Sequence, residues 1–345
     1  MGTDRPQSPS TCEIEERGVS PILARLPLDR TRFRPGVAGK LLYHLLPIRR
    51  RVVLDGLRRA FGAELDSQAI RHLAQCCYSH TARSIHEIFS FFASSENLLK
   101  RKVRVVGHEH LVEAARGKRG VLVLTGHFGN WETAPLAALL HFHDYYGRFH
   151  FVRTALFSRA LESLLFRRYR RFGLGVIPKQ DALPRILEAL SRNDAVVFVL
   201  DQHVGISRRL GIPVEFFGRK AGTHRSLALV ARHTGAPVIP ATSWRESSGH
   251  HVIRFDPPVP WIPCEDPAQE IYRNTRRYNQ VLEGYVREHP DQYFWFHRRW
   301  RIREAAAAPP IPTRIAERQP RSGEPRLAEL ESRPCAIDSP RRGAL

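Results

Sequence analysis

The chain has 345 residues, of which 42% are hydrophobic, and this is enough to bury one large core or two small ones. Its five cysteines, Cys12, Cys76, Cys77, Cys264 and Cys335, form no C-x-x-C pair, which argues against the usual zinc and disulfide scaffolds. Neither a secretory signal peptide nor a run of about 18 uncharged apolar residues occurs, so export and a membrane-spanning helix are not predicted.

The formal net charge of +20 is the most pronounced global feature. Residues 305–345 contain seven arginines and five acidic residues, so nearly all of the excess belongs to the rest of the chain. A field of this sign attracts an anionic partner, which can be nucleic acid, an anionic membrane leaflet or a phosphorylated substrate. Charge alone does not choose among the three.

The N-terminal part of the chain divides into two segments. Residues 1–20 are polar and predict a flexible lead-in, whereas residues 21–102 predict a helical, membrane-proximal segment. Within it, Val37–Leu46 is too short to span a bilayer. It is either a helix lying in the membrane interface with the following arginines at the headgroups, or an ordinary packed helix. Further helices are expected at 50–62 and at 67–92, the latter after good capping residues.

Strand and helix patterns alternate over residues 103–304. Short strands are expected at 103–106, 121–124, 149–152, 195–200, 238–240 and 252–255. Helices are expected between them at 108–117, 131–142, 156–171, 182–192, 222–235 and 268–288. The alternation predicts an α/β domain with helices on the faces of a sheet. Residues 305–345 are rich in Pro, Arg and Glu and predict a disordered tail.

One segment, Gly120-Val-Leu-Val-Leu-Thr-Gly-His-Phe-Gly-Asn-Trp-Glu132, carries the clearest chemical signal. An apolar strand ends at Gly126 and places His127 at the edge of the sheet where ligands of α/β proteins bind. Asn130 is expected to cap the next helix, with Glu132 in its first turn. Folded back toward His127, the Glu132 carboxylate can accept the Nδ1 proton and leave Nε2 as a general base. A structural histidine is the alternative interpretation.

The segment His-Phe-Gly-Asn-Trp-Glu resembles the H-x4-D/E signature of the bacterial lipid A late acyltransferases, the lauroyl and myristoyl transferases of the wider lysophospholipid acyltransferase superfamily. Further motifs of the family follow in the same order along the chain, up to one near its C-terminal end. The similarity covers residues 37 to about 303. Its other motifs are Phe151–Thr154, Arg171–Pro178, Val199–Gln202, Phe216–Gly218 with Thr223, Thr234–Pro240 with Arg245, and His289–Trp300. Members of that family often begin with a spanning helix, and this chain has only the short candidate at 37–46.

The resemblance implies a glycerol-3-phosphate-acyltransferase-like fold, with a mixed sheet flanked by helices and a helical N-terminal segment. It implies transfer of a fatty acyl group from acyl carrier protein or acyl-CoA to a hydroxyl of a phosphorylated glycolipid such as a lipid A precursor, without a cofactor. Because the apolar runs are interrupted by charges and arginines cluster at 49–51, 167–171 and 298–301, we expect the enzyme to be bound peripherally on the cytoplasmic face of the bacterial inner membrane. The implied catalytic residues are His127 and Glu132, and the implied substrate-binding residues are Asn130, Arg153, Arg171, Asp201, Gln202, Phe217, Gly218 and Thr223.

Most of these residues also have a purely structural interpretation. Arg153 either holds a phosphate or polarises the thioester carbonyl, or it pairs with an acid at a strand end. Asp201 and Gln202 either position the acceptor sugar or cap a loop. The basic run at 167–171 is either a solvated face or an attractor of the phosphorylated substrate, and Phe217 lies either at the acyl entry or in the core. The segment Trp295–Trp300 is either an interfacial anchor or a buried plug.

Competing functions explain less of the sequence. Another membrane lipid, a phosphoglycolipid or an aminolipid, is the alternative acceptor within the same class. A basic nucleic-acid-binding protein is the alternative from a different class, but no recognition motif or arginine-rich arm accompanies the charge, and we expect no nucleic-acid partner. A non-catalytic membrane adaptor leaves the His127 segment unexplained. The chain has no serine-hydrolase elbow, P-loop or dinucleotide fingerprint, and we expect no metal site.

Overall fold

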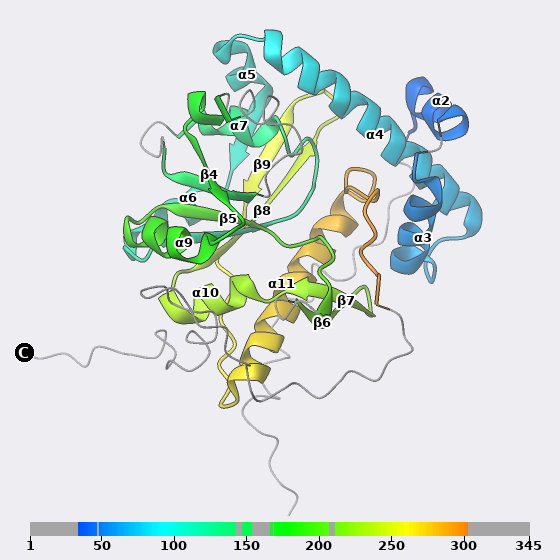
Figure 1. The fold of residues 1–345 in the computed structure, drawn as a ribbon. Helices are drawn as coiled ribbons and strands as arrows, with labels where there is room; N and C mark the ends of the chain where they lie inside the picture. The colour runs from blue at the N-terminus through cyan, green and yellow to red at the C-terminus, as the bar shows by residue number, and fades with distance from the viewer. Residues whose placement is uncertain are drawn as a thin grey trace, which may run out of the picture.

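The protein is described from a computed structural model, which covers residues 34–46, 48–142, 147–153, 166–167, 169–206 and 211–302. Its centre is a seven-stranded sheet with helices on both faces (Figure 1). The order across the sheet is β1-β9-β8-β2-β5-β3-β4. These strands are β1 (Val103–Val106), β2 (Val121–Thr125), β3 (Phe149–Arg153), β4 (Leu174–Pro178), β5 (Ala195–Val199), β8 (Val238–Arg245) and β9 (His251–Phe255).

The sheet is mixed, as the resemblance implied, because β8 and β9 pair antiparallel while every other pair in it is parallel. The central strands are apolar throughout, since side chains of a parallel strand alternate between two buried faces. Leu122 and Leu124 of β2 belong to one core cluster, and Val121 and Val123 belong to a second cluster on the opposite face. The sheet therefore separates two hydrophobic cores.

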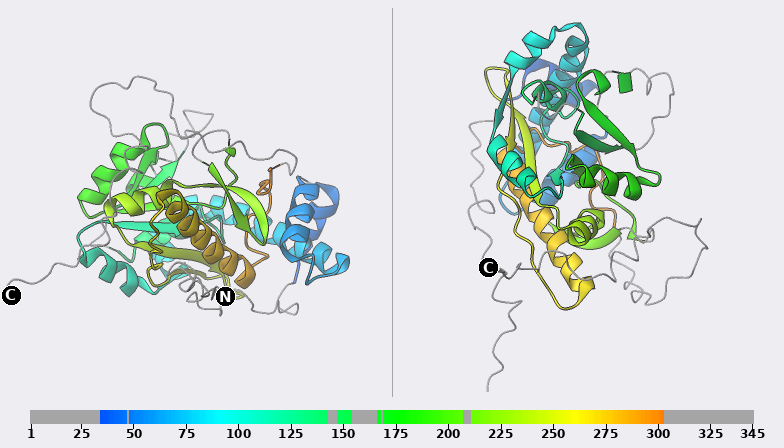
Figure 2. Two further views of the ribbon diagram at one scale, coloured as in Figure 1. Left: turned by 90° about the horizontal axis from the view of Figure 1, so that it is seen from below. Right: turned by 90° about the vertical axis from the view of Figure 1, so that its left-hand side faces the viewer.

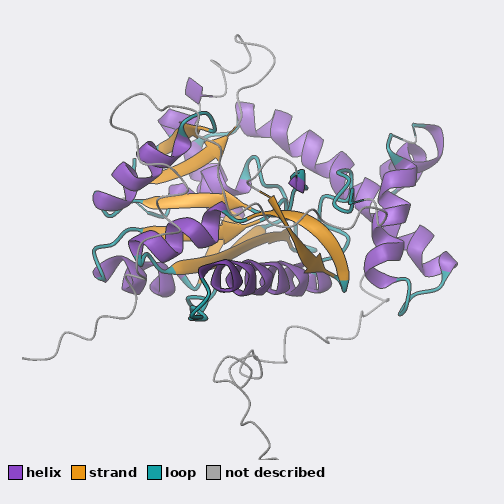
Figure 3. Cartoon of the chain, turned by 60° about the horizontal axis from the view of Figure 1, so that its bottom comes forward, coloured by secondary structure: helices purple, strands orange, loops and turns teal. Residues whose placement is uncertain are grey.

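Helices cover both of these faces (Figure 3). On the face of Val121 and Val123 lie α5 (Glu96–Lys102), α6 (His108–Arg116) and α7 (Ala134–Leu139). On the face of Leu122 and Leu124 lie α9 (Ala182–Ser191), α10 (Ser226–Thr234) and α11 (Pro267–Glu288). The long helix α11 buries Tyr278, Leu282 and Tyr285 in that core. The layered α/β prediction is confirmed.

The N-terminal helices lie to one side of this body (Figures 1 and 2). They are α2 (Val37–Leu45), α3 (Arg50–Phe61) and α4 (Ser67–Ala93), which confirms the predicted helical N-terminal segment. The side chain of Asp66 caps α4 by accepting a hydrogen bond from the Ala69 amide at 2.7 Å. Helix α2 approaches α4 closely at Gly39, where a Cβ would come within 1.9 Å of Ser79 Oγ. No helix in the described ranges is long and apolar enough to cross a membrane.

Several predicted elements differ from those observed. The helix expected at 222–235 is shortened to α10, because β7 (Arg219–His224) pairs with β6 (Gly211–Phe216) in a hairpin outside the main sheet. Phe217 and Gly218, both at positive φ, form the two-residue turn of this hairpin. The helix expected at 131–142 begins only at Ala134. Strand β4 and helix α5 were not predicted. The polar lead-in, the C-terminal tail and most of the helix expected at 156–171 lie outside the described residues.

Candidate active site

His127 and Asp201 lie side by side because of the sheet topology. His127 follows β2 by two residues, and Asp201 follows β5 by two residues. Strands β2 and β5 are parallel neighbours, with Thr125 in register with Val199. The two side chains therefore leave the same carboxyl edge of the sheet, which is where α/β folds assemble ligand sites.

Asp201 binds His127 through both of its carboxylate oxygens. Oδ1 lies 2.9 Å from His127 Nδ1, and Oδ2 accepts a hydrogen bond from the His127 backbone N–H at 2.9 Å. The carboxylate is completely buried. Burial raises the pKa of Asp201, but the charge and hydrogen bonds of His127 outweigh it and hold that pKa well below its ordinary value. The carboxylate stays ionised and fixes the proton of His127 on Nδ1.

Gly126 allows this close approach. A Cβ at position 126 would lie 3.1 Å from the carboxylate carbon of Asp201 and 2.7 Å from the ring of Phe128. Any larger residue at position 126 would push the turn that carries His127 away from Asp201. The sequence Gly-His at the end of β2 is therefore a packing requirement of the His127–Asp201 pair.

The turn after His127 is held by backbone contacts with the C-terminal segment. The Phe294 amide donates to His127 O at 3.0 Å, and the Gly129 amide donates to Gln292 O at 3.0 Å. Gly129 itself has a φ of 55° and lies against Ser243. The amides of Phe128 and Gly129, which follow His127, both donate to backbone carbonyls, so in this arrangement neither is available to stabilise an oxyanion. Another donor must take that part.

A buried polar network of side chains from α4 and β8 contacts the turn that follows His127. Arg245 donates to Glu87 and His80, and His80 Nε2 lies 3.0 Å from Gly129 O. Burial, reinforced by the charge of Arg245, lowers the pKa of His80 to about 3, so this ring is neutral. Asn130 is 1% exposed and donates to the carboxylate of Glu87 at 2.9 Å. It therefore joins α4 to the turn and does not cap α7, whose N-cap is Thr133.

The C-terminal segment also holds Asp201 and Gln202. His297 Nε2 lies 3.0 Å from the backbone oxygen of Asp201, and Arg299 donates to the backbone oxygen of Gln202 at 3.0 Å. Arg299 is 2% exposed and Trp295 is also 2% exposed. Of the two interpretations of Trp295–Trp300, the buried plug is the observed one.

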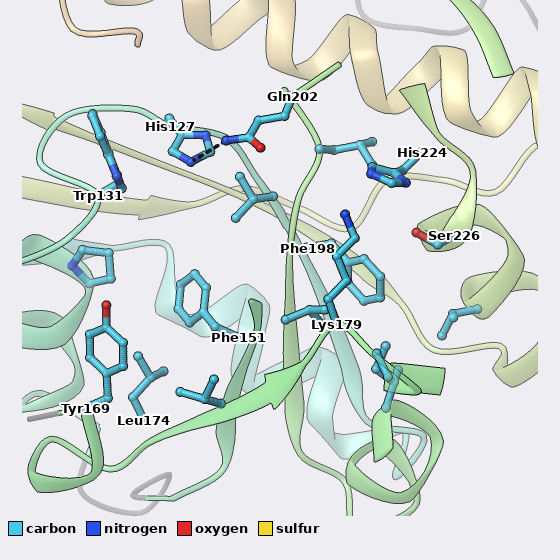
Figure 4. Close-up of a pocket in the computed structure, with 18 of the residues that line it drawn as sticks. His127, Trp131, Phe151, Tyr169, Leu174, Lys179, Phe198, Gln202, His224 and Ser226 are labelled. Atoms are coloured by element: carbon cyan, nitrogen blue, oxygen red, sulfur yellow. Dashed lines mark hydrogen bonds between the residues drawn. The ribbon is translucent and has the colours of Figure 1, made fainter. Parts of the chain in front are cut away.

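His127 opens onto a cavity of about 660 Å³ (Figure 4). Trp131, Phe151, Leu174 and Phe198 give it an apolar lining, to which several polar side chains are added. These polar side chains are Glu132, Tyr169, Lys179, Asp181, Gln202, His224 and Ser226. A narrower apolar cavity of about 110 Å³ also begins at His127 and Trp131 and runs between the sheet and α7. A long apolar chain and a polar headgroup can thus meet at His127.

The Nε2 atom of His127 faces this cavity. It lies 3.3 Å from Gln202 Nε2, and the pair is drawn as a dashed line in Figure 4. Since the proton of His127 is on Nδ1, the Nε2 lone pair accepts from the Gln202 amide. The imidazole is in the form that a general base requires.

Glu132 differs from its predicted role. The partner of His127 Nδ1 is Asp201, and the Glu132 carboxylate instead accepts a hydrogen bond from the Tyr169 hydroxyl at 2.9 Å. The physical reason is the late start of α7, which leaves Glu132 in a turn on the wall of the cavity. Glu132 is thus a lining residue of the cavity that contains His127.

The remaining predicted residues lie in different places. Arg153 ends β3, next to the cavity residues Phe151 and Val152. Arg171 is on the surface and pairs with Glu96 at 2.9 Å. Phe217 and Gly218 form the turn of the β6–β7 hairpin, and buried Thr223 accepts a hydrogen bond from Arg299 at 2.8 Å. Of the predicted set, the structure brings His127, Glu132, Asp201 and Gln202 together.

Sequence reasoning did not assign a role to Trp131, Tyr169, Lys179, His224 or Ser226. Trp131 belongs to the segment Gly120–Glu132, and its position four residues after His127 was a signal that could have identified it. Tyr169 precedes β4, Lys179 follows it, His224 ends β7 and Ser226 begins α10. Their convergence depends on an order of strands that a single sequence does not reveal. Among the described residues, no group of three or more His, Cys, Asp and Glu side chains could hold a metal ion.

Comparisons with known proteins find similarity to bacterial acyltransferases. A family model described as bacterial lipid A biosynthesis acyltransferase matches residues 17–302. The chain is 22% identical to the lipid A biosynthesis lauroyltransferase of Escherichia coli (strain K12), over 83% of this chain and 90% of that protein. It is 23% identical to the lipid A biosynthesis palmitoleoyltransferase of the same organism, over 72% of this chain and 83% of that protein. It is 26% identical to the phosphatidylinositol mannoside acyltransferase of Mycolicibacterium smegmatis, over 49% and 54%.

Proposed function

Because this chain belongs to the bacterial lipid A biosynthesis acyltransferase family, we propose that it transfers a fatty acyl group from a thioester to a hydroxyl of a glycolipid, with His127 as the general base. The observation that carries this proposal is the double contact of Asp201 with the backbone N–H and the Nδ1 of His127, which leaves Nε2 as the ring atom that faces the cavity. Relatives that are named acyltransferases of lipid A and of phosphatidylinositol mannoside support the glycolipid acceptor.

The reaction is a direct transfer in two steps. The hydroxyl of the acceptor takes the place of the Gln202 amide at Nε2, and His127 removes its proton as the oxygen attacks the carbonyl carbon of the thioester. The tetrahedral intermediate then collapses, the C–S bond breaks, and the thiolate takes the proton from His127. Asp201 stabilises the imidazolium that exists between the two steps, and it remains ionised throughout.

Gln202 is the proposed oxyanion donor. Its amide lies 3.3 Å from His127 Nε2, so it is next to the atom where the reacting carbonyl must arrive. Once the acceptor hydroxyl replaces it at Nε2, the amide can donate to the developing oxyanion. Arg299 holds the Gln202 backbone in place from the buried side. The apolar cavities on either side of Trp131 supply room for the acyl chain.

The donor in this proposal is acyl carrier protein or acyl-CoA, and the acceptor is a phosphorylated glycolipid of the lipid A precursor type. A phosphatidylinositol mannoside-like acceptor is the second candidate, because a relative with that printed activity aligns over half of this chain. The charge of +20 suits either acceptor, since both carry phosphate in an anionic membrane.

The proposed location is the cytoplasmic face of the inner membrane, with the protein bound peripherally. Helix α2 exposes Val37, Leu41 and Leu45, which are spaced by four residues and therefore share one helix face. Leu46 and Ile48 extend this exposed set, and Lys40 and Arg51 are exposed nearby. An apolar stripe next to basic side chains is typical of a helix that lies in an anionic membrane interface.

The direct experiment is a transfer assay with the purified protein. Acyl carrier protein or CoA carrying a radiolabelled acyl group is incubated with each acceptor in mixed micelles, and the lipids are extracted and counted. We expect label in the glycolipid with at least one donor. Hydrolysis to free fatty acid, with no lipid product from either acceptor, would contradict transfer and leave only a thioesterase activity.

A further inference from the structure

One corner of the active-site cavity collects polar side chains whose purpose the acyl transfer step does not explain. Lys179 follows β4, His224 ends β7, and Ser226 begins α10, and all three line the cavity that contains His127. Figure 4 shows the Lys179 amine and the His224 ring pointing into the cavity, across from Trp131 and Tyr169. Three separate elements thus converge on one place.

We propose that Lys179, His224 and Ser226 form a subsite for a phosphoryl group of a substrate, on the wall of the active-site cavity. The proposal rests on the proposed function, because the phosphoryl group must belong to a substrate of the same cavity. Two sources share this chemistry, namely a phosphate of the glycolipid acceptor and the phosphate of the pantetheine arm that carries the acyl group.

The first argument is the lack of internal partners. Within the described part of the chain, the side chains of Lys179, His224 and Ser226 have no hydrogen bond or ion pair; Lys179 is exposed, and the other two are half-buried. An ammonium group offers three donors, a hydroxyl one, and an imidazole at least one. A phosphoryl group presents acceptor oxygens in several directions and can satisfy such a set from one position, whereas a neutral sugar hydroxyl can accept from only one or two of them.

The second argument is electrostatic. Burial, together with the positive charges of Lys179 and Arg299, lowers the pKa of His224 to about 4. The corner is therefore electropositive, and a bound anion would relieve the repulsion among these groups. Asp181 also lines the cavity, but it is exposed. A bound anion would compete with it for Lys179 without displacing a buried ion pair.

The position of the subsite also suits the reaction. Its residues and His127 line one cavity that also has an apolar wall of Trp131, Phe151, Leu174 and Phe198. An anion at the subsite and an acyl chain against that wall therefore occupy different surfaces. The hydroxyl or the thioester connected to that anion is then oriented toward Nε2 of His127. The subsite therefore selects phosphorylated substrates over their dephosphorylated analogues.

Binding is tested first without any reaction. Inorganic pyrophosphate is titrated into the full-length protein with 13C-labelled histidine, and His224→Gln identifies the His224 signal. We expect pyrophosphate to shift this signal and to raise the pKa of His224, and we expect Lys179→Gln to weaken the affinity by roughly 10- to 100-fold. Arg185→Gln is the matched control, because Arg185 is an exposed cation on α9 that does not line the cavity. A His224 signal that millimolar pyrophosphate leaves unmoved in the wild type would overturn the proposal.

Kinetics then identify the source of the phosphate. If it belongs to the acceptor, Lys179→Gln raises KM for the phosphorylated glycolipid about tenfold or more and leaves KM for its dephosphorylated analogue and for the donor unchanged. If it belongs to the donor, Lys179→Gln instead raises KM for the acyl donor in the transfer reaction and leaves KM for the phosphorylated glycolipid unchanged. Equal KM values for wild type and variant with every substrate would refute the subsite. Wild type that binds pyrophosphate at His224 but transfers no acyl group would refute only the proposed function.

Discussion

The carboxylate of Asp201 holds His127 at both its backbone N–H and its Nδ1, each at 2.9 Å. The two residues are 74 positions apart and meet because each follows a strand by two residues in a parallel pair. This geometry fixes the ring orientation and the tautomer together, without a flexible side chain between them. In the proposed mechanism, this geometry makes Asp201 the positioning residue for His127.

Replacing Asp201 by Asn tests this relationship. We expect Asp201→Asn to lower kcat for acyl transfer by at least about 10²-fold, because the amide no longer fixes the proton on Nδ1 or stabilises the imidazolium. Glu132→Gln is the informative comparison, since a Gln side chain can still accept from the Tyr169 hydroxyl. We expect a smaller loss there. If Glu132→Gln were inactive and Asp201→Asn fully active, Glu132 would be the partner of His127 during turnover.

Arg299 gives a prediction for stability. Its guanidinium donates to the backbone oxygens of Gln202 and Gly222 and to the side chains of Thr223 and Asn279. A lysine cannot reproduce this fork, so we expect Arg299→Lys to lower the free energy of unfolding by roughly 2 kcal/mol or more. Urea unfolding measures the change, with exposed Arg298→Lys as the control. An unchanged midpoint for Arg299→Lys would show that the network is not needed for stability.

Glu283 makes the stability of the fold depend on pH. It is half-buried next to the β6–β7 hairpin and accepts a hydrogen bond from the Phe217 amide. Its partial removal from solvent raises its pKa from 4.5 to about 7. The folded chain therefore retains a proton here that the unfolded chain releases. Between about pH 4.5 and 7 the contribution of Glu283 to stability falls as pH rises.

We expect Glu283→Gln to remove this dependence while keeping an acceptor for the Phe217 amide. Its melting temperature should exceed that of the wild type at pH 8, by roughly 2–4 °C for each kcal/mol of penalty removed, and should match it near pH 4. Calorimetry at both pH values measures the difference. Glu188→Gln, an exposed carboxylate, should show no such gain. A Glu283→Gln variant that is less stable at pH 8 would mean that the carboxylate is ionised and needed.

Helix α2 gives a prediction for membrane binding. We expect the double variant Leu41→Ser and Leu45→Ser to bind vesicles of phosphatidylethanolamine and phosphatidylglycerol at least about tenfold more weakly, because each exposed leucine contributes apolar area on insertion. Sedimentation with vesicles measures the affinity, with Leu98→Ser on α5 as the control.

Extraction of membranes gives a second test of the peripheral attachment. High salt should release part of the wild-type protein from the membrane fraction, and alkaline carbonate nearly all of it. Retention through carbonate would show an integral attachment.

The sequence predicted the layered α/β fold because its strands are short apolar runs and its longer helices are amphipathic and well capped. The β6–β7 hairpin was missed, since the alternation of buried Ala221 and Thr223 in β7 blends into the apolar pattern of α10. The signal that was available was the pair Phe217-Gly218, which supports a two-residue turn at positive φ.

At the site, the sequence identified His127 and the strand end that presents it, but it did not identify the partner of Nδ1. Both Glu132 and Asp201 were candidates for some role, and proximity in sequence favoured Glu132. The choice depends on which strands are neighbours, and strand order is a tertiary property that local pattern does not contain. The buried network of His80, Glu87 and Arg245 is hidden for the same reason.

The central claim, that His127 is the base in acyl transfer, is tested most directly by one comparison. Wild type and His127→Ala are purified in parallel, matched for melting temperature, and assayed with labelled acyl carrier protein or acyl-CoA and a phosphorylated glycolipid. We predict transfer of label to the glycolipid by the wild type and a loss of about 10²-fold or more in the variant. Activity of the folded His127→Ala variant within about threefold of the wild type would contradict the account.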